Sequence, residues 1–193
     1  MVVLFPILIG ALSACTNPFA LRDPEPPVDT QSTWVPPLSP EQVMENFQNA
    51  VMEKNVENYV RCLADGSQDA RSFRFVPDPE VAANYPTVFT AWSRETEEAV
   101  VQQAFSIVPG DSSSLLSFPE EVQEVMASDS AIFVRGYRLE LQHTREGLAS
   151  VYEGLGEFRM APGQGGEWSI YHWIDNRIGD VPSWSRLKAS LGG

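Results

Sequence analysis

Three long stretches that alternate apolar and polar residues fill the C-terminal third of the chain, and they constrain its fold more than any other feature. They cover Ala131 to Thr144, Leu148 to Met160 and Glu167 to Ile178. A period of two is typical of a strand with one buried face, and short Gly-containing turns make neighbouring strands antiparallel. Gly154 and Gly156 inside the second stretch indicate a bend or bulge. We therefore expect a strongly curved meander of three strands.

Helical patterns come before these strands. Ser39 is a good N-cap residue, Pro40 suits the first helical position, and apolar residues follow at helical spacing. The same arguments predict further elements, namely helices over 56–63, 93–107 and 183–191 and a short strand over 72–76. Helices therefore precede the long strands, and one short helix closes the chain.

This order of elements resembles the nuclear transport factor two-like family, also called SnoaL-like. The opening Pro40–Phe47 followed by Asn55–Tyr59 is similar to the family's helix, break and second helix. The ending Trp168–Asp175 and Ser183–Lys188 is similar to lipid-anchored, uncharacterised members from bacterial envelopes. The resemblance implies an α+β fold, a cystatin-like cone in which a strongly curved antiparallel sheet wraps around the N-terminal helices.

The N-terminus begins with an uncharged apolar run from Val2 to Leu12. It has the length of the apolar region of a signal peptide and is shorter than the ~20 residues that span a bilayer. The run ends in Leu12-Ser13-Ala14-Cys15, which resembles the lipobox of bacterial lipoproteins. The resemblance implies that residues 1–14 are removed and that Cys15 is acylated. The alternative is a buried N-terminal strand or helix with an ordinary core cysteine.

Lipidation would place the domain in a bacterial envelope. The residue after the cysteine is Thr16 and not the Asp that resembles an inner-membrane retention signal. By this analogy the chain is anchored in the outer membrane and faces the periplasm. Seven of the fifteen prolines lie in residues 16–40, a composition that favours an extended polyproline II tether. We therefore expect a signal peptide over 1–14, a lipidated tether over 15–38 and one domain over 39–193, with Trp34 and Val35 docked on the domain.

Charge and cysteine content restrict the possible partners. The net charge of −13 disfavours nucleic acid as a partner, because phosphate backbones repel a polyanion. If Cys15 is acylated, Cys62 has no partner for a disulfide, and its apolar surroundings predict a small buried hydrophobic residue. Neither a metal-ligand motif nor a Gly-rich phosphate loop occurs, so we expect no metal and no cofactor.

The candidates for chemistry lie on the last strand and in the expected cone. His172 alternates with isoleucines on one face of that strand and is the first candidate for a general base. Asp175 lies on the opposite face and is the candidate for an acid in a pocket. The resemblance implies a carboxylate or histidine base inside the cone, assisted by a tyrosine or aspartate. Tyr59, Tyr137 and Trp173 are the candidates for lining a binding cavity.

Three functions follow from these features. The first is a non-catalytic, lipid-anchored envelope protein whose cone binds a ligand or a protein. The second is a small-molecule isomerase, dehydratase or hydrolase that uses His172 or Asp175 as its base. The third is an assembly subunit, because relatives of this fold often form dimers through the open face of the sheet. An open cavity beside these residues would favour the enzyme, and a cone filled by Phe, Trp and Leu would favour binding or assembly.

Arg135 and Arg138 lie on opposite faces of their strand. One of the two is expected to face the concave side of the sheet and pair with a carboxylate.

Overall fold

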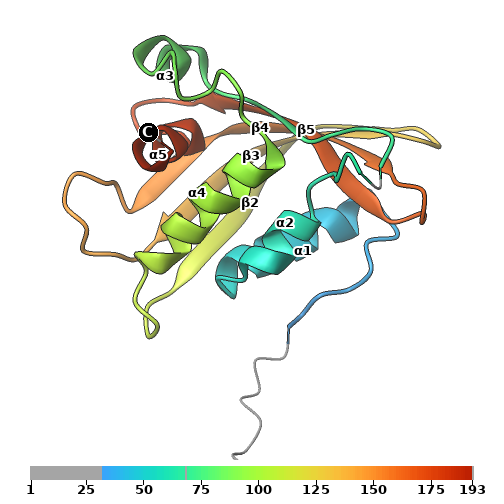
Figure 1. Cartoon of the computed structure of the whole chain (residues 1–193), viewed down its shortest axis with the longest axis horizontal. Coiled ribbons are helices and arrows are strands. Elements are labelled where there is room, and N and C mark those ends of the chain that lie inside the picture. Colours follow the sequence, from blue (N-terminus) through green and yellow to red (C-terminus); the bar gives the residue numbers. More distant parts are fainter. Residues whose placement is uncertain (1–31, 68, 193) are drawn as a thin grey trace, which may run out of the picture. The chain divides into compact units, whose positions relative to one another are not determined.

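A curved sheet with helices packed on its concave side forms the centre of this α+β chain (Figure 1). The computed structural model describes residues 32–67 and 69–192, so Cys15 and most of the expected tether lie outside the described residues. The described elements, in chain order, are α1 (Pro40–Met52), α2 (Val56–Arg61), β1 (Arg74–Val76), α3 (Pro79–Asn84), α4 (Arg94–Ser106), β2 (Ser114–Met126), β3 (Ala131–Leu141), β4 (Val151–Pro162), β5 (Trp168–Arg177) and α5 (Trp184–Leu191).

The helices begin where their capping residues predict. Ser39 Oγ accepts a hydrogen bond from Gln42 N at 3.4 Å, and Asn55 Oδ1 accepts one from Asn58 N at 3.0 Å. Each bond satisfies a backbone N–H that has no partner inside the helix. The helices predicted over 93–107 and 183–191 are confirmed as α4 and α5, while α3 was not expected from the sequence patterns.

The sheet has the strand order β1-β5-β4-β3-β2. The predicted antiparallel meander is confirmed as β3, β4 and β5, and β2 adds a fourth long antiparallel strand. The short strand β1 is parallel to β5, with Phe75 opposite Trp173. The sheet is therefore mixed at this edge, where a purely antiparallel sheet was expected.

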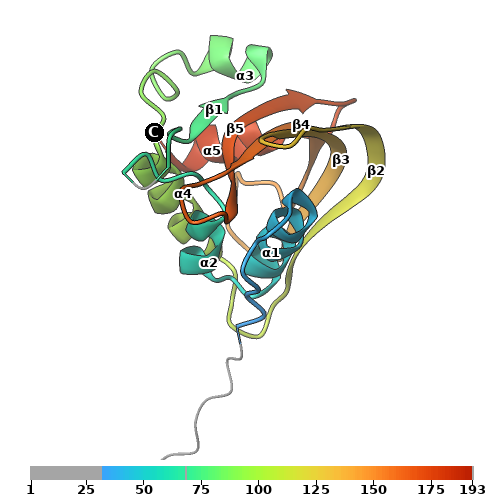
Figure 2. The same cartoon turned by 90° about the vertical axis from the view of Figure 1, so that its right-hand side faces the viewer.

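The sheet bends over α1, α2 and α4 (Figures 1 and 2). The predicted bend in the second long strand coincides with close packing at its glycines. A Cβ atom on Gly154 would lie 2.5 Å from Tyr137 Oη and 2.6 Å from Asn176 O, and one on Gly156 would lie 2.6 Å from the ring of Phe158. Glycine is required at both positions because the aromatic side chains of the concave face lie directly against the β4 backbone.

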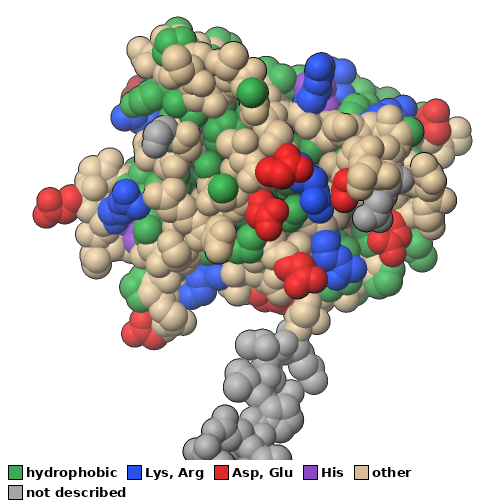
Figure 3. All heavy atoms as spheres, in the orientation of Figure 1, with side chains coloured by type: hydrophobic (Ala, Val, Ile, Leu, Met, Phe, Trp, Pro, Cys, Tyr) green, Lys and Arg blue, Asp and Glu red, His purple; other side chains and the backbone are tan. Residues whose placement is uncertain are grey.

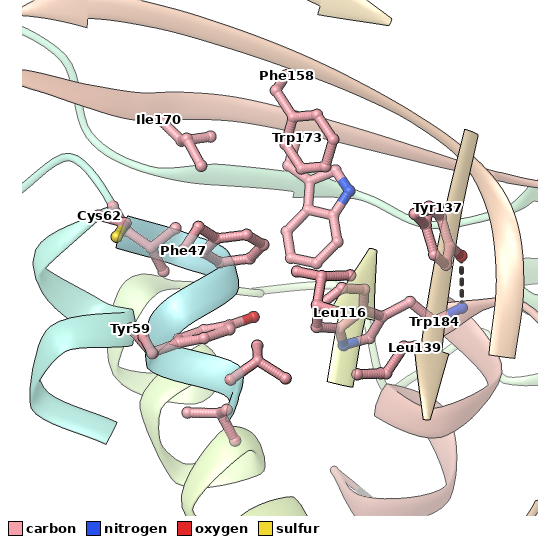
Figure 4. Close-up of a cluster of buried hydrophobic side chains, with 14 of the residues drawn as sticks. Phe47, Tyr59, Cys62, Leu116, Tyr137, Leu139, Phe158, Ile170, Trp173 and Trp184 are labelled. Atoms are coloured by element: carbon pink, nitrogen blue, oxygen red, sulfur yellow. Dashed lines mark hydrogen bonds between the residues drawn. The ribbon is translucent and has the colours of Figure 1, made fainter. Parts of the chain in front are cut away.

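Aromatic rings fill the interior of the cone (Figure 4). Phe47 of α1 lies between strand and helix, with ring centroids 5.7 Å from Trp173 and 5.8 Å from Trp184. Phe158 of β4 lies 5.4 Å from Trp173. These side chains are almost inaccessible to solvent, and Phe47, Phe158 and Trp173 are 0% exposed. The space that could hold a ligand in an open cone is therefore taken up by the chain's own core.

Candidate functional site

His172 lies on the outer face of the sheet and not in the cone. In the pairing of β4 with β5, Met160 is opposite Ile170 and Arg159 is opposite His172, so Tyr171 is an extra residue in β5. This bulge reverses the expected alternation: Ile170 points into the core, whereas His172 points outward. Partial burial and then the charge of Arg159 lower the pKa of His172. The expectation that His172 shares a face with Ile170 is wrong because of this bulge.

Asp175 is fully buried and positions the start of α5. Its carboxylate accepts hydrogen bonds from Tyr137 Oη at 2.6 Å and from Ser185 N at 2.7 Å. Tyr137 Oη in turn accepts a hydrogen bond from Trp184 N at 2.7 Å, as the dashed line in Figure 4 shows. Burial raises the pKa of Asp175, and the bonds from Ser185 and Tyr137 oppose that shift. The structure therefore brings two predicted residues, Asp175 and Tyr137, into contact around the first turn of a helix.

A second buried polar cluster lies near the concave face, and sequence patterns did not indicate it. Glu97 Oε2 lies 2.8 Å from Lys188 Nζ, and both side chains are almost fully buried. Tyr59 Oη donates to Glu97 Oε1 at 2.7 Å, and Trp92 Nε1 donates to Glu97 Oε2 at 2.7 Å. Burial lowers the pKa of Lys188 to about 8, while the charge of Glu97 opposes that shift. We call Glu97, Lys188, Tyr59 and Trp92 the buried polar cluster.

Aromatic rings surround the ammonium group of this cluster. Lys188 Nζ lies 3.4 Å from the ring centroid of Phe75 and 3.6 Å from that of Trp173. An ammonium over the face of an aromatic ring is attracted by the ring's negative face, the more so where water is absent. Lys188 therefore occupies the position that a cationic ligand would take in an aromatic cage. The apolar stripe of α5, with Trp184, Leu187 and Leu191 around Lys188, was the sequence signal for its burial.

The buried polar cluster leaves almost no space for another molecule. A gap between α4 and α5 beside Glu97, Trp184 and Leu187 has a volume of about 10 Å³. A cavity of about 10–15 Å³ holds one water molecule, so this gap is too small for an organic substrate. Tyr59, Tyr137 and Trp173, the predicted lining residues, are 2% exposed or less. The structure gathers them in the core but does not expose them.

Two further predictions concern single side chains. Cys62 is confirmed as a buried residue: its Sγ lies 3.3 Å from Asn58 O, and burial raises the pKa of the thiol. Arg135 faces the concave side and pairs with Glu124 at 2.6 Å, as expected for one of the two arginines. Arg138 lies on the outer face and pairs with carboxylates of its own and the neighbouring strand.

A solvent-accessible groove lies at the end of the sheet where β4 turns into β5. Its volume is about 680 Å³, and we call it the tryptophan groove because Trp34 and Trp168 line it. Its charged lining residues are Arg61, Arg94, Asp65, Asp69 and Glu167. Figure 3 shows acidic and basic side chains side by side over the helical face, without a large area of one sign. The groove is therefore an accessible concave site, and its lining carries charges of both signs.

Hydrogen bonds to the backbone hold the walls of the groove in place. Trp168 N donates to Pro37 O at 2.7 Å, so the segment that carries Trp34 is tied to β5. Asn46 accepts from Val35 N at 3.2 Å and donates to Val35 O at 2.6 Å. Trp34 packs against the core and the Val35 backbone is bonded to α1, although the Val35 side chain is 47% exposed. The expected docking of this segment is thus confirmed for Trp34.

The charged groups of the groove differ in how strongly they are bound. Arg61 stacks over the ring of Trp34, with its guanidinium carbon 4.0 Å from the centroid, and forms no ion pair within residues 32–67 and 69–192. Arg94 donates to a backbone carbonyl at 3.2 Å and lies 4.0 Å from Asp65. Asp69 accepts from Asp65 N at 2.9 Å. The acids therefore hold the loop around Asp65 and Asp69, while both guanidinium groups have N–H donors without a partner among residues 32–67 and 69–192.

The described part of the chain contains neither a metal-binding cluster nor a membrane-spanning helix. No group of three His, Cys, Asp or Glu side chains in residues 32–67 and 69–192 is arranged to hold a metal ion. No helix in that part of the chain combines the length and apolar character needed to cross a membrane.

Comparison with known proteins identifies the fold. No protein-family model matches the sequence, and no curated protein matches it either. Among solved structures, the chain is similar to a putative aromatic ring hydroxylase from Novosphingobium aromaticivorans, with 9% identity, a TM-score of 0.56 and coverage of 77% of this chain and 92% of that one. It is also similar to an NTF2-like superfamily protein from Salmonella enterica serovar Typhimurium, with 10% identity, a TM-score of 0.52 and coverage of 74% and 87%.

A third solved structure is a putative calcium/calmodulin-dependent protein kinase II association domain from Xanthomonas campestris. The identity is 14%, the TM-score 0.53, and the match covers 73% of this chain and 86% of that one. At such low identity the likeness concerns the fold alone. The NTF2-like fold, with a curved sheet around helices, is therefore confirmed, and these proteins' names do not transfer a reaction to this chain.

Proposed function

We propose that the chain is a lipid-anchored protein of a bacterial envelope whose NTF2-like domain binds a ligand at its surface without catalysing a reaction. The sequence Leu12-Ser13-Ala14-Cys15 after an apolar run supports the anchor, and the proline-rich segment that follows supports a tether. A diacylglycerol and an N-acyl chain would bury dozens of methylene groups at about 0.8 kcal/mol each, so anchoring would be effectively permanent.

The filled cone is the observation that carries the non-catalytic part of this proposal. An enzyme of this type needs a base that a substrate can reach within hydrogen-bond distance. Asp175 and Tyr137 are in contact, but their polar atoms are occupied by each other and by the first turn of α5. Lys188 and Glu97 pair in the dry interior. His172 lies on the other face of the sheet, away from both groups.

The tryptophan groove supports the binding part of the proposal. Ligand sites are typically concave, largely pre-formed and roughly 300–1,000 Å³ in volume. The groove, at about 680 Å³, falls within this range, and its walls are fixed by backbone hydrogen bonds. Its lining combines two indoles with charged and polar groups, which suits recognition of a small polar molecule.

Mass spectrometry of protein purified from a bacterial membrane tests the anchor. The mature protein should begin at Cys15 and carry the mass of the acyl chains, and Cys15→Ala should abolish both the added mass and the membrane association. Cys62→Ala is the matched control, because it removes the other cysteine from the buried core and should leave acylation unchanged. An intact Met1 on a freely soluble wild-type product would contradict the proposal.

A further inference from the structure

The tryptophan groove contains two aromatic surfaces contributed by distant parts of the sequence. Trp34 comes from the segment before α1 and Trp168 from the first residue of β5, and both side chains are half-buried. The bond from Trp168 N to Pro37 O at 2.7 Å fixes one segment against the other. The groove therefore offers rigid indoles that need little ordering when a ligand binds, which lowers the entropic cost of association.

Polar groups of both kinds line the same groove. Arg61 and Arg94 supply guanidinium donors, whereas Asp65, Asp69 and Glu167 supply carboxylate acceptors. Ser67 N donates to Asp65 at 2.9 Å, and Ser169 Oγ to Asp69 at 3.4 Å, so these carboxylates are held in fixed positions. The ion pair between Arg94 and Asp65, both of which line the groove, is long at 4.0 Å. Donors and acceptors are thus interleaved without a surplus of positive charge.

This combination excludes several ligand classes. Phosphorylated or strongly anionic ligands need a concentration of positive charge, and the three carboxylates of the groove oppose it. A purely apolar ligand would leave the guanidinium and carboxylate groups desolvated without partners. A neutral sugar matches both the indoles and the polar groups of the groove. The C–H face of its ring is apolar and packs on an indole, while its hydroxyl groups donate and accept hydrogen bonds at the rim.

We infer that the tryptophan groove binds a neutral oligosaccharide, with one sugar ring against Trp168 and hydroxyl groups bonded by Arg61, Arg94 and the fixed carboxylates. The inference rests on the proposed function, since it names the ligand of that surface. Arg61 covers one face of Trp34, is exposed, and lines the same groove as Trp168. The same lining accepts an N-acetylated amino sugar or a plain glucan, and the experiment separates these sources.

Calorimetric titration of the full chain, in a detergent without a sugar headgroup, tests the inference with tri-N-acetylchitotriose and cellotriose. Binding of either sugar supports it, and a preference between the two identifies the source. Trp168→Ala should weaken binding about tenfold or more, and Arg61→Ala about three- to tenfold. Arg61 is exposed, so its replacement should leave the fold intact even if Trp168→Ala destabilises it.

Arg71→Ala is the matched control. Arg71 is also an exposed arginine, stacked over Tyr171 with its guanidinium carbon 4.6 Å from the ring centroid, but it does not line the groove. The Arg71→Ala variant should bind both trisaccharides with the affinity of the wild type. The inference would be overturned if the wild type bound neither trisaccharide at about 10 mM, or if Arg71→Ala lost as much affinity as Arg61→Ala. Acylation at Cys15 is measured independently, so a failure of sugar binding alone would leave the anchor standing.

Discussion

Replacing Lys188 by methionine removes the ammonium group from the interior of the cone while keeping a side chain of similar length. Nζ lies 2.8 Å from Glu97 Oε2, and the two side chains are 0% and 1% exposed. Removal of one partner from a buried pair costs about 3–5 kcal/mol, because the remaining charge stays in a dry environment. For a domain of this size 1 kcal/mol lowers the melting temperature by about 2–4 °C, so the expected decrease is about 6–20 °C.

A double-mutant cycle separates the pair from the packing around it. Glu97→Gln/Lys188→Met removes both charges, keeps an oxygen that can accept from Tyr59, and should recover about 2 kcal/mol relative to the sum of the single variants. Urea unfolding followed by the fluorescence of the five tryptophans gives the four free energies. The reasoning fails if Lys188→Met costs less than about 1 kcal/mol, or if the two single effects simply add.

Two further predictions follow from buried groups and close contacts. Gly154→Ala should lower the free energy of unfolding by about 1–3 kcal/mol, because the new Cβ would lie 2.5 Å from Tyr137 Oη. Gly165→Ala is the control and should change stability by less than about 0.5 kcal/mol, because no atom lies within 4 Å of its new Cβ. Equal melting temperatures for the two variants would refute this prediction. In a chain whose leader cysteine is replaced by serine, the Cys62 thiol should react with a thiol reagent only as fast as the protein unfolds, since it is buried and its pKa is raised, and rapid labelling of the native protein would show that this part of the core opens.

The elements with strong periodicity could be predicted from the sequence. The three C-terminal strands and the capped helices follow local patterns, because one face of each element is buried and the other is exposed. β2 was missed because Pro119, Glu120, Glu121 and Glu124 interrupt its pattern and its second half is exposed on both faces. It is an edge strand, and its charges and proline are features that limit pairing with another chain.

The candidate sites were less predictable, for two physical reasons. The bulge at Tyr171 inserts one residue into β5, and a single insertion reverses which side chains face the core, so His172 could not be placed from alternation alone. The buried polar cluster and the tryptophan groove join residues that are far apart in the chain. Glu97 and Lys188 belong to different helices, and although Lys188 lies on the apolar stripe of α5, the sequence does not show that it meets Glu97.

A crystal structure of the full chain, purified from a bacterial membrane, measures what fills the cone. We expect Lys188 Nζ against Glu97 and between the rings of Phe75 and Trp173, with electron density from protein atoms only. Density for a bound organic molecule between Asp175 and these aromatic rings, with α5 displaced to admit it, would contradict the account and restore an enzymatic function for the cone.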